Sequence, residues 1–222
     1  MPFVPRRIFL FSLLLASLLA FAAKEFAMPN IFAAKTYPAH DDHPLEKISI
    51  AADPYDVADK AAIFNEDYAD KGYLPILLVI TNDSDQPIAL NNLKIQLITK
   101  RRDKITAATE DDLYRRFSKV KRRGDEPSRN PLPIPLPGRG PNVGVNKKNR
   151  DEIDAAMFSA KAVAPHENQA GFFFFDVSGI SQPLAGARLY ATGITNNDGQ
   201  ELMYFEIPME KYLGYTPPGT AK

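Results

Sequence analysis

Hydrophobic and polar positions alternate in several short segments of the first half of the chain. Residues 47–52 and 92–99 carry apolar side chains at every second position, which is the period of a strand with one buried face. Residues 74–81 are almost entirely aliphatic and predict a central strand buried on both faces. Turn-forming residues at 82–87 end that strand. This half of the chain therefore predicts strands separated by turns.

The last third of the chain also predicts strands. Four consecutive phenylalanines occupy residues 172–175, and no solvated face accommodates such a run, so we expect this strand to be buried on both faces. Residues 187–194 and 201–207 form two further strand candidates, and the Asp198-Gly199 pair between them is a strong hairpin signal.

The middle of the chain has helical and proline-rich patterns instead. Thr109 followed by Asp112 is close to a capping box and predicts a helix over about 110–122. A second helix is predicted over about 150–158. Between them, residues 127–141 contain six prolines, which fix φ and favour an extended, polyproline-like segment.

Short strands on both sides of a helical segment predict a mainly β fold, an antiparallel β-sandwich. The stretch LVITNDSDQPI at 78–88 and the segment 163–176 resemble the strand-turn-strand units of bacterial exported immunoglobulin-like domains. The resemblance implies an immunoglobulin-like β-sandwich in the cell envelope and no enzymatic activity. The helical and proline-rich insert at 109–160 departs from the family pattern.

The N-terminus predicts export. Arg6 and Arg7 precede an apolar run at 8–21, which ends in Ala20-Phe21-Ala22. A basic start, an apolar stretch too short to span a bilayer and a small-x-small end are typical of a cleaved signal peptide. Arg6-Arg7-Ile8-Phe9-Leu10 also resembles the twin-arginine signal, so the export route stays open. We expect a periplasmic or secreted protein with no transmembrane span after cleavage.

The expected organisation follows from these patterns. Residues 1–22 form the signal peptide, and residues 23–44, which lack clear periodicity, form a flexible leader. The β-sandwich covers residues 45–215, and residues 216–222 form a tail that is rich in small residues and proline.

Composition excludes several functions. The chain has no cysteine, so disulfides, thiol catalysis and cysteine metal sites are excluded. With 27 basic and 27 acidic residues, no overall field favours nucleic acid, and we expect no nucleic-acid partner.

Charge is uneven locally: residues 100–123 carry ten basic and four acidic side chains. Cations at the end of the predicted helix are favoured by its dipole, but a basic helix end followed by a proline-rich arm also suits an envelope protein or an anionic surface as partner. We expect the interaction surface within residues 113–142. Its candidate residues are Arg115, Arg116, Lys119, Lys121, Arg122, Arg123, Pro133 and Pro135.

Two further kinds of site were weighed. His40 and His43 flank two aspartates, a ligand set that suits Zn²⁺ or Cu²⁺. The alternative function is therefore a periplasmic metal-binding or metal-delivery protein, although a polar leader explains the same residues. A hydrolase ranks third, because the serines lie in no nucleophile motif and His166 is the plausible base. We expect a non-catalytic protein-interaction or envelope-associated module without a cofactor.

Overall fold

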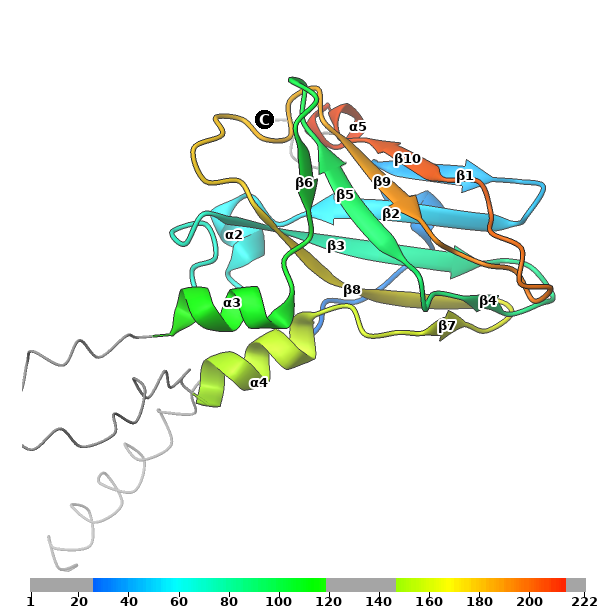
Figure 1. Ribbon diagram of the computed structural model, residues 1–222, viewed down its shortest axis with the longest axis horizontal. Helices are drawn as coiled ribbons and strands as arrows, with labels where there is room; N and C mark the ends of the chain where they lie inside the picture. The colour runs from blue at the N-terminus through cyan, green and yellow to red at the C-terminus, as the bar shows by residue number, and fades with distance from the viewer. Residues whose placement is uncertain (1–25, 119–146, 215–222) are drawn as a thin grey trace, which may run out of the picture.

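The computed structural model describes residues 26–118 and 147–214. Most of this part of the chain is antiparallel β-sheet (Figure 1). The strands are β1 (His40–His43), β2 (Ile48–Pro54), β3 (Tyr73–Asn82), β4 (Ile88–Ala89), β5 (Lys94–Ile98), β6 (Lys104–Thr106), β7 (Ala162–Val163), β8 (Glu167–Asp176), β9 (Arg188–Thr192) and β10 (Phe205–Pro208). The helices are η2 (Ala34–Thr36), α2 (Ala58–Ala61), α3 (Glu110–Phe117), α4 (Lys147–Ala156) and α5 (Glu210–Leu213).

The described strands form two four-stranded sheets and one short pair. The first sheet has the order β1-β2-β3-β8, and the second has the order β10-β9-β5-β6. All of their pairings are antiparallel, and β4 pairs with β7 beside them (Figure 1). The predicted mainly β, antiparallel, sandwich-like fold is therefore confirmed.

Strand β3 separates two cores. Ile76, Leu78 and Ile80 belong to the core shared with the second sheet. Leu77 and Val79 point the other way, into a second apolar cluster on the outer face of the first sheet. Successive side chains of a strand alternate between faces, so a strand covered on both sides has to be apolar throughout. This explains the unbroken aliphatic run and confirms that the strand is buried on both faces.

Strand β8 is divided in the same way. Phe172 and Phe174 pack on the outer face, whereas Phe175 lies in the core between the sheets. At Gly171 the chain that follows α4 runs directly over β8, and a Cβ there would lie 2.4 Å from the Cα of Phe158. The Phe158 N–H donates to the Phe172 carbonyl at 3.1 Å. A glycine at this position therefore permits the close approach of two backbones.

The predicted local signals are present, but the first helix, predicted to run to about residue 122, ends at Phe117 because Ser118 adopts an extended conformation. The Thr109 side chain accepts from the Asp112 N–H and the Asp112 side chain accepts from the Thr109 N–H, which completes the capping box of α3. Strands β9 and β10 form the predicted hairpin pair. The second predicted helix corresponds to α4, whose described part begins at Lys147, three residues before the expected start.

The segment expected to be a flexible leader has a defined structure from residue 26 onward. His40–His43 pairs with β2 as an edge strand, and the Ala34 N–H donates to the Thr81 hydroxyl at 2.8 Å in a buried position. Strand β2 follows this segment directly in the chain, whereas Thr81 lies 47 positions after Ala34. The segment's own sequence has no apolar periodicity that reveals either contact.

Several predicted features lie outside the described residues. They are the signal peptide at 1–22, the proline-rich segment at 127–141, the C-terminal tail at 216–222, and the candidate residues Lys119, Lys121, Arg122, Arg123, Pro133 and Pro135.

Candidate functional site

The outer face of the β1-β2-β3-β8 sheet is covered by a third layer. The layer consists of the N-terminal segment, the loop after α2, and helices α3 and α4. Its centre is aromatic: the ring centroids of Phe64 and Phe172 are 5.0 Å apart, and those of Tyr68 and Phe174 are 4.6 Å apart. Burial raises the pKa of the Tyr68 hydroxyl. This face is an extension of the core and presents no sheet surface to a ligand.

A buried carboxylate fastens α4 to that layer. Glu152 is 3% exposed. Its side chain accepts from the Asn65 N–H at 2.7 Å and from the Asn65 side-chain amide at 2.6 Å. The Glu66 N–H donates to its other oxygen at 3.4 Å. These donors stabilise a carboxylate that would otherwise be costly to bury. The carboxylate therefore holds the loop against α4.

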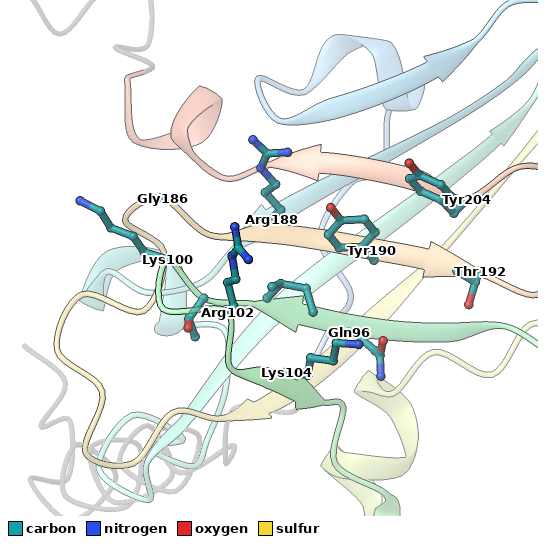
Figure 2. A pocket seen from close by; sticks show the side chains of 11 residues that line it. Gln96, Lys100, Arg102, Lys104, Gly186, Arg188, Tyr190, Thr192 and Tyr204 are labelled. Atoms are coloured by element: carbon teal, nitrogen blue, oxygen red, sulfur yellow. The ribbon is translucent and has the colours of Figure 1, made fainter.

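The outer face of the β10-β9-β5-β6 sheet, by contrast, is open and carries a groove of about 750 Å³ (Figure 2). Strands β5 and β9 supply Gln96, Tyr190 and Thr192 to this groove. The turn between β5 and β6, and the start of β6, supply Lys100, Arg102 and Lys104. We call this surface the open-face groove.

The open-face groove is cationic. Of the described residues that line it, four are basic and none is acidic. Arg188 is paired with Glu206, and the hydrogen bond with Glu206 is also the main reason why the pKa of Tyr190 is raised. Lys100, Arg102 and Lys104 have no ion pair or side-chain hydrogen bond with any residue in 26–118 or 147–214. Three positive charges are therefore available to a ligand.

Arg102 is held in an unfavourable backbone conformation. Its φ is 70°, in the left-handed region where glycine and asparagine are preferred. The turn is fixed by Thr99, whose N–H donates to the Asp103 carbonyl at 3.0 Å and whose hydroxyl donates to the Asp103 carboxylate at 3.1 Å. A strained position that retains a long cationic side chain at the rim of a groove is a feature typical of functional sites.

The other end of the groove is aromatic. The ring centroids of Tyr190 and Tyr204 lie 5.7 Å apart, and Tyr204 is 50% exposed. Thr192 lies beside them (Figure 2). The open-face groove thus combines cations, exposed rings and hydrogen-bonding side chains, which are the groups that bind polar, negatively charged ligands.

The two described residues of the predicted interaction surface lie elsewhere. Arg116 on α3 donates to Asp176 at 2.6 Å and its guanidinium lies 5.4 Å from the centroid of the Tyr73 ring. Arg115 and Arg116 line a polar cleft together with Asp112 and Asp176, so charge there is balanced. Hydrogen bonds from Ser178, and to a lesser extent the neighbouring Arg116, lower the pKa of Asp176. Arg116 therefore forms an ion pair within the fold, with Asp176. Arg115 has no ion pair with any residue in the described part of the chain.

The structure does not bring His40 and His43 together. They are three residues apart on an extended strand, which directs them to opposite faces. The His40 ring is hydrogen-bonded to the Tyr37 carbonyl at 2.6 Å, whereas the His43 ring stacks on Phe205 at 3.9 Å between centroids. In the described segments, no group of three or more histidine, aspartate or glutamate side chains is arranged to hold a metal ion.

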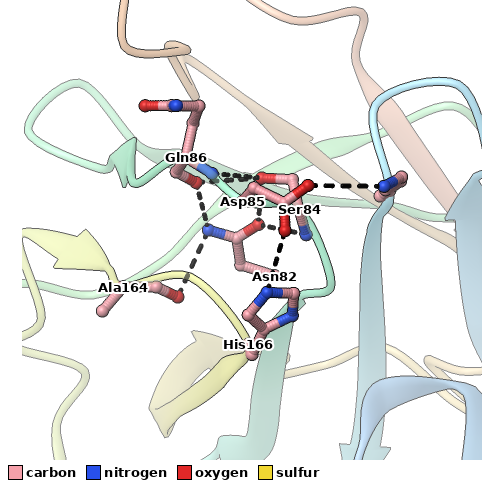
Figure 3. A network of polar contacts seen from close by, with 7 residues as sticks. Asn82, Ser84, Asp85, Gln86, Ala164 and His166 are labelled. Carbon is pink, nitrogen blue, oxygen red and sulfur yellow. Dashed lines mark hydrogen bonds and ion pairs between the residues drawn. The ribbon is translucent and has the colours of Figure 1, made fainter.

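The turn after β3 is a structural network (Figure 3). The Asn82 amide donates to the Gln86 carbonyl at 2.8 Å, while its oxygen accepts from the Ser84 hydroxyl at 2.7 Å. His166 contacts Asp85 at 3.1 Å. Ser84 and His166 are thus engaged with different partners and do not form a nucleophile–base pair. The amide and carboxylate side chains of this turn act as turn formers.

The sequence contains part of the signal for the open-face groove. The charged residues at 100–104 indicate a turn, and the strand alternation at 92–99 and 187–194 indicates one solvent-facing side. What was missing was the neighbourhood of Arg188, Tyr190 and Tyr204, which are about ninety residues further along the chain and reach the turn only through the β5–β9 pairing.

Comparison with protein-family models, with curated proteins and with solved structures finds no match for this chain. None of the helices formed by residues 26–118 and 147–214 has the length and apolar character needed to cross a membrane.

Proposed function

We propose that this protein is a non-catalytic, exported binding module that recognises an anionic component of the cell envelope at the open-face groove. One observation carries the proposal. Of the two four-stranded sheets, one has its outer face covered by an aromatic layer, whereas the other presents a groove with three cations that have no ion-pair partner among residues 26–118 and 147–214. Cations that do not stabilise the fold through ion pairs are available for recognition of a partner.

Further observations support the individual parts of this proposal. Export is supported by the basic, apolar and small-x-small pattern of residues 1–22. An immunoglobulin-like sandwich is supported by the way the chain crosses between the two sheets. It passes from β3 in the first sheet to β5 in the second, returns from β6 to β8 in the first, and crosses again from β8 to β9 in the second. A binding role is supported by the full engagement of Ser84 and His166 in turn contacts.

Envelope binding tests the proposal directly. Purified protein is mixed with isolated cell envelopes from its own host and sedimented, and the bound fraction is measured. We expect the double variant Arg102→Glu/Lys104→Glu to lose at least about tenfold in affinity, and rising salt to weaken the wild type.

The matched control is Arg115→Glu, which reverses a cation on α3 and tests the interaction surface predicted from sequence. We expect it to bind envelopes like the wild type. Loss of binding in Arg115→Glu, with full binding in the groove variant, would place recognition on α3 and contradict the proposal. Equal binding by all three proteins would also contradict it.

A further inference from the structure

We infer that the ligand of the open-face groove is a linear polysaccharide whose sugar rings carry carboxylates. This inference rests on the proposed function and names the chemistry of the partner. It follows from three properties of the described groove lining, namely the spread of its charges, its accessible aromatic end with the half-exposed Tyr204, and the scarcity of aliphatic side chains.

The charges are distributed rather than focused. Lys100 and Arg102 come from the turn between β5 and β6, Lys104 is the first residue of β6, and the three side chains are spread along the groove (Figure 2). A compact multiply charged group, such as a phosphate, is bound best by donors that converge on one point. Single charges repeated along a chain match separate cations, and a guanidinium pairs with a carboxylate through two parallel hydrogen bonds.

The side chain of Lys100 packs against the backbone of Gly186. Gly186 has a φ of +66°, and a Cβ there would lie 3.2 Å from three carbons of the Lys100 side chain. The lysine stem therefore rests on a backbone without a side chain. This contact holds the ammonium group at the end of the groove while its charge stays in solvent.

The aromatic end suits sugar rings. Tyr190 and Tyr204 combine a flat apolar surface with a hydroxyl, and Tyr204 is half exposed. The C–H face of a pyranose can pack on such a ring, while its hydroxyls hydrogen-bond to neighbouring polar side chains. Gln96 and Thr192 on the adjacent strands provide an amide and a hydroxyl for this purpose.

The same lining argues against an acidic protein as the occupant. Ile98 is the only aliphatic side chain among the residues within 26–118 and 147–214 that line the groove. Protein interfaces place an apolar centre inside a polar rim, with aromatic or aliphatic anchors in pockets. The groove has no such centre, which favours a hydrophilic chain over a folded partner.

Calorimetric titration of the purified protein with a hexamer of galacturonate tests this inference. The matched ligands are the methyl-esterified hexamer, which keeps the sugars without the charges, and hexaglutamate, which keeps charges without sugars. We expect the galacturonate hexamer to bind at least about tenfold more tightly than either. Tyr204→Ala should weaken binding by about tenfold, Arg102→Glu by at least as much, and Arg115→Glu by less than about twofold.

The outcomes separate the inference from the proposed function. No binding of the galacturonate hexamer, or equal affinity for hexaglutamate with no effect of Tyr204→Ala, overturns the polysaccharide inference. If the protein then still binds envelopes through Arg102 and Lys104, the proposed function stands with a different anionic ligand. If envelope binding is also independent of these residues, both fail.

Discussion

The outer faces of the two sheets are built from the same kind of strand pairing but differ in what covers them. On the first sheet, Phe172 and Phe174 are fully buried beneath α3, α4 and the loop after α2. On the second sheet, the equivalent outward positions hold Gln96, Tyr190 and Thr192, which remain partly accessible. One face thus adds to the stability of the fold, and the other leaves its side chains available for binding.

The largest effect is expected from removing a ring on the covered face. Phe172→Ala should lower the free energy of unfolding by about 3–5 kcal/mol, because it leaves a cavity among four aromatic neighbours. Chemical denaturation measures this change. Tyr204→Ala on the open face is the matched variant and should change stability by less than about 0.5 kcal/mol. Similar losses in both variants would show that the two faces do not differ in this way.

The attachment of the covering layer is tested at Glu152. Glu152→Ala should cost about 2–3 kcal/mol, because it leaves the part-buried N–H donors of Asn65 and Glu66 without their acceptor. The exposed neighbour Asp151 on the same helix provides the control, since Asp151→Ala removes a carboxylate without touching that loop. If both variants unfold at the same denaturant concentration, the carboxylate does not hold α4 in place.

A smaller, pH-dependent effect is expected at the start of α3. Hydrogen bonds from Thr109 lower the pKa of Asp112 below its ordinary 3.8. The stabilisation is therefore complete above 3.8 and is lost as the pH falls through the lower pKa of the folded state. Thr109→Ala should cost about 1 kcal/mol at neutral pH. Asp112→Ala should be destabilised at neutral pH and approach the wild type in strong acid, as followed by denaturation across pH. A difference that does not change with pH would exclude the charged cap as the cause.

The smallest change in stability is expected for a substitution on the open face, and it should increase the free energy of unfolding instead of lowering it. Arg102→Gly relieves a φ of 70° and should raise the free energy of unfolding by about 0.5–1 kcal/mol. The same variant should weaken envelope binding. Thermal denaturation together with the sedimentation assay measures both quantities. A variant that is more stable and binds fully would show that Arg102 is not retained for binding.

Features with a local cause could be predicted from the sequence. The capping box needs only Thr109 and Asp112, and the β9–β10 hairpin needs alternation around Asp198-Gly199. The doubly buried strands β3 and β8 were predictable for a similar reason, because continuous apolar runs have no solvent-facing alternative.

Features assembled from distant segments could not be predicted in this way. Strand β1 has no apolar periodicity, although its partner β2 follows it directly in the chain. A distant contact also positions it, because Asp41 accepts from the Glu206 N–H at 2.8 Å across 165 positions. The basic stretch at 100–123 was one feature in the sequence. The fold divides it between the open-face groove and α3, where Arg116 is paired with Asp176.

The sequence by itself determined the mainly β architecture, the two helices of the insert and the doubly buried strands, because periodicity, caps and turns act over a few residues. Only the tertiary structure decided which sheet face would be covered and which cations would remain unpaired. Those outcomes depend on long-range contacts such as the β5–β9 pairing and the Glu152 contacts with residues 65 and 66. The pattern along the chain indicates which residues are buried. Which residues pack against them is decided by the tertiary structure.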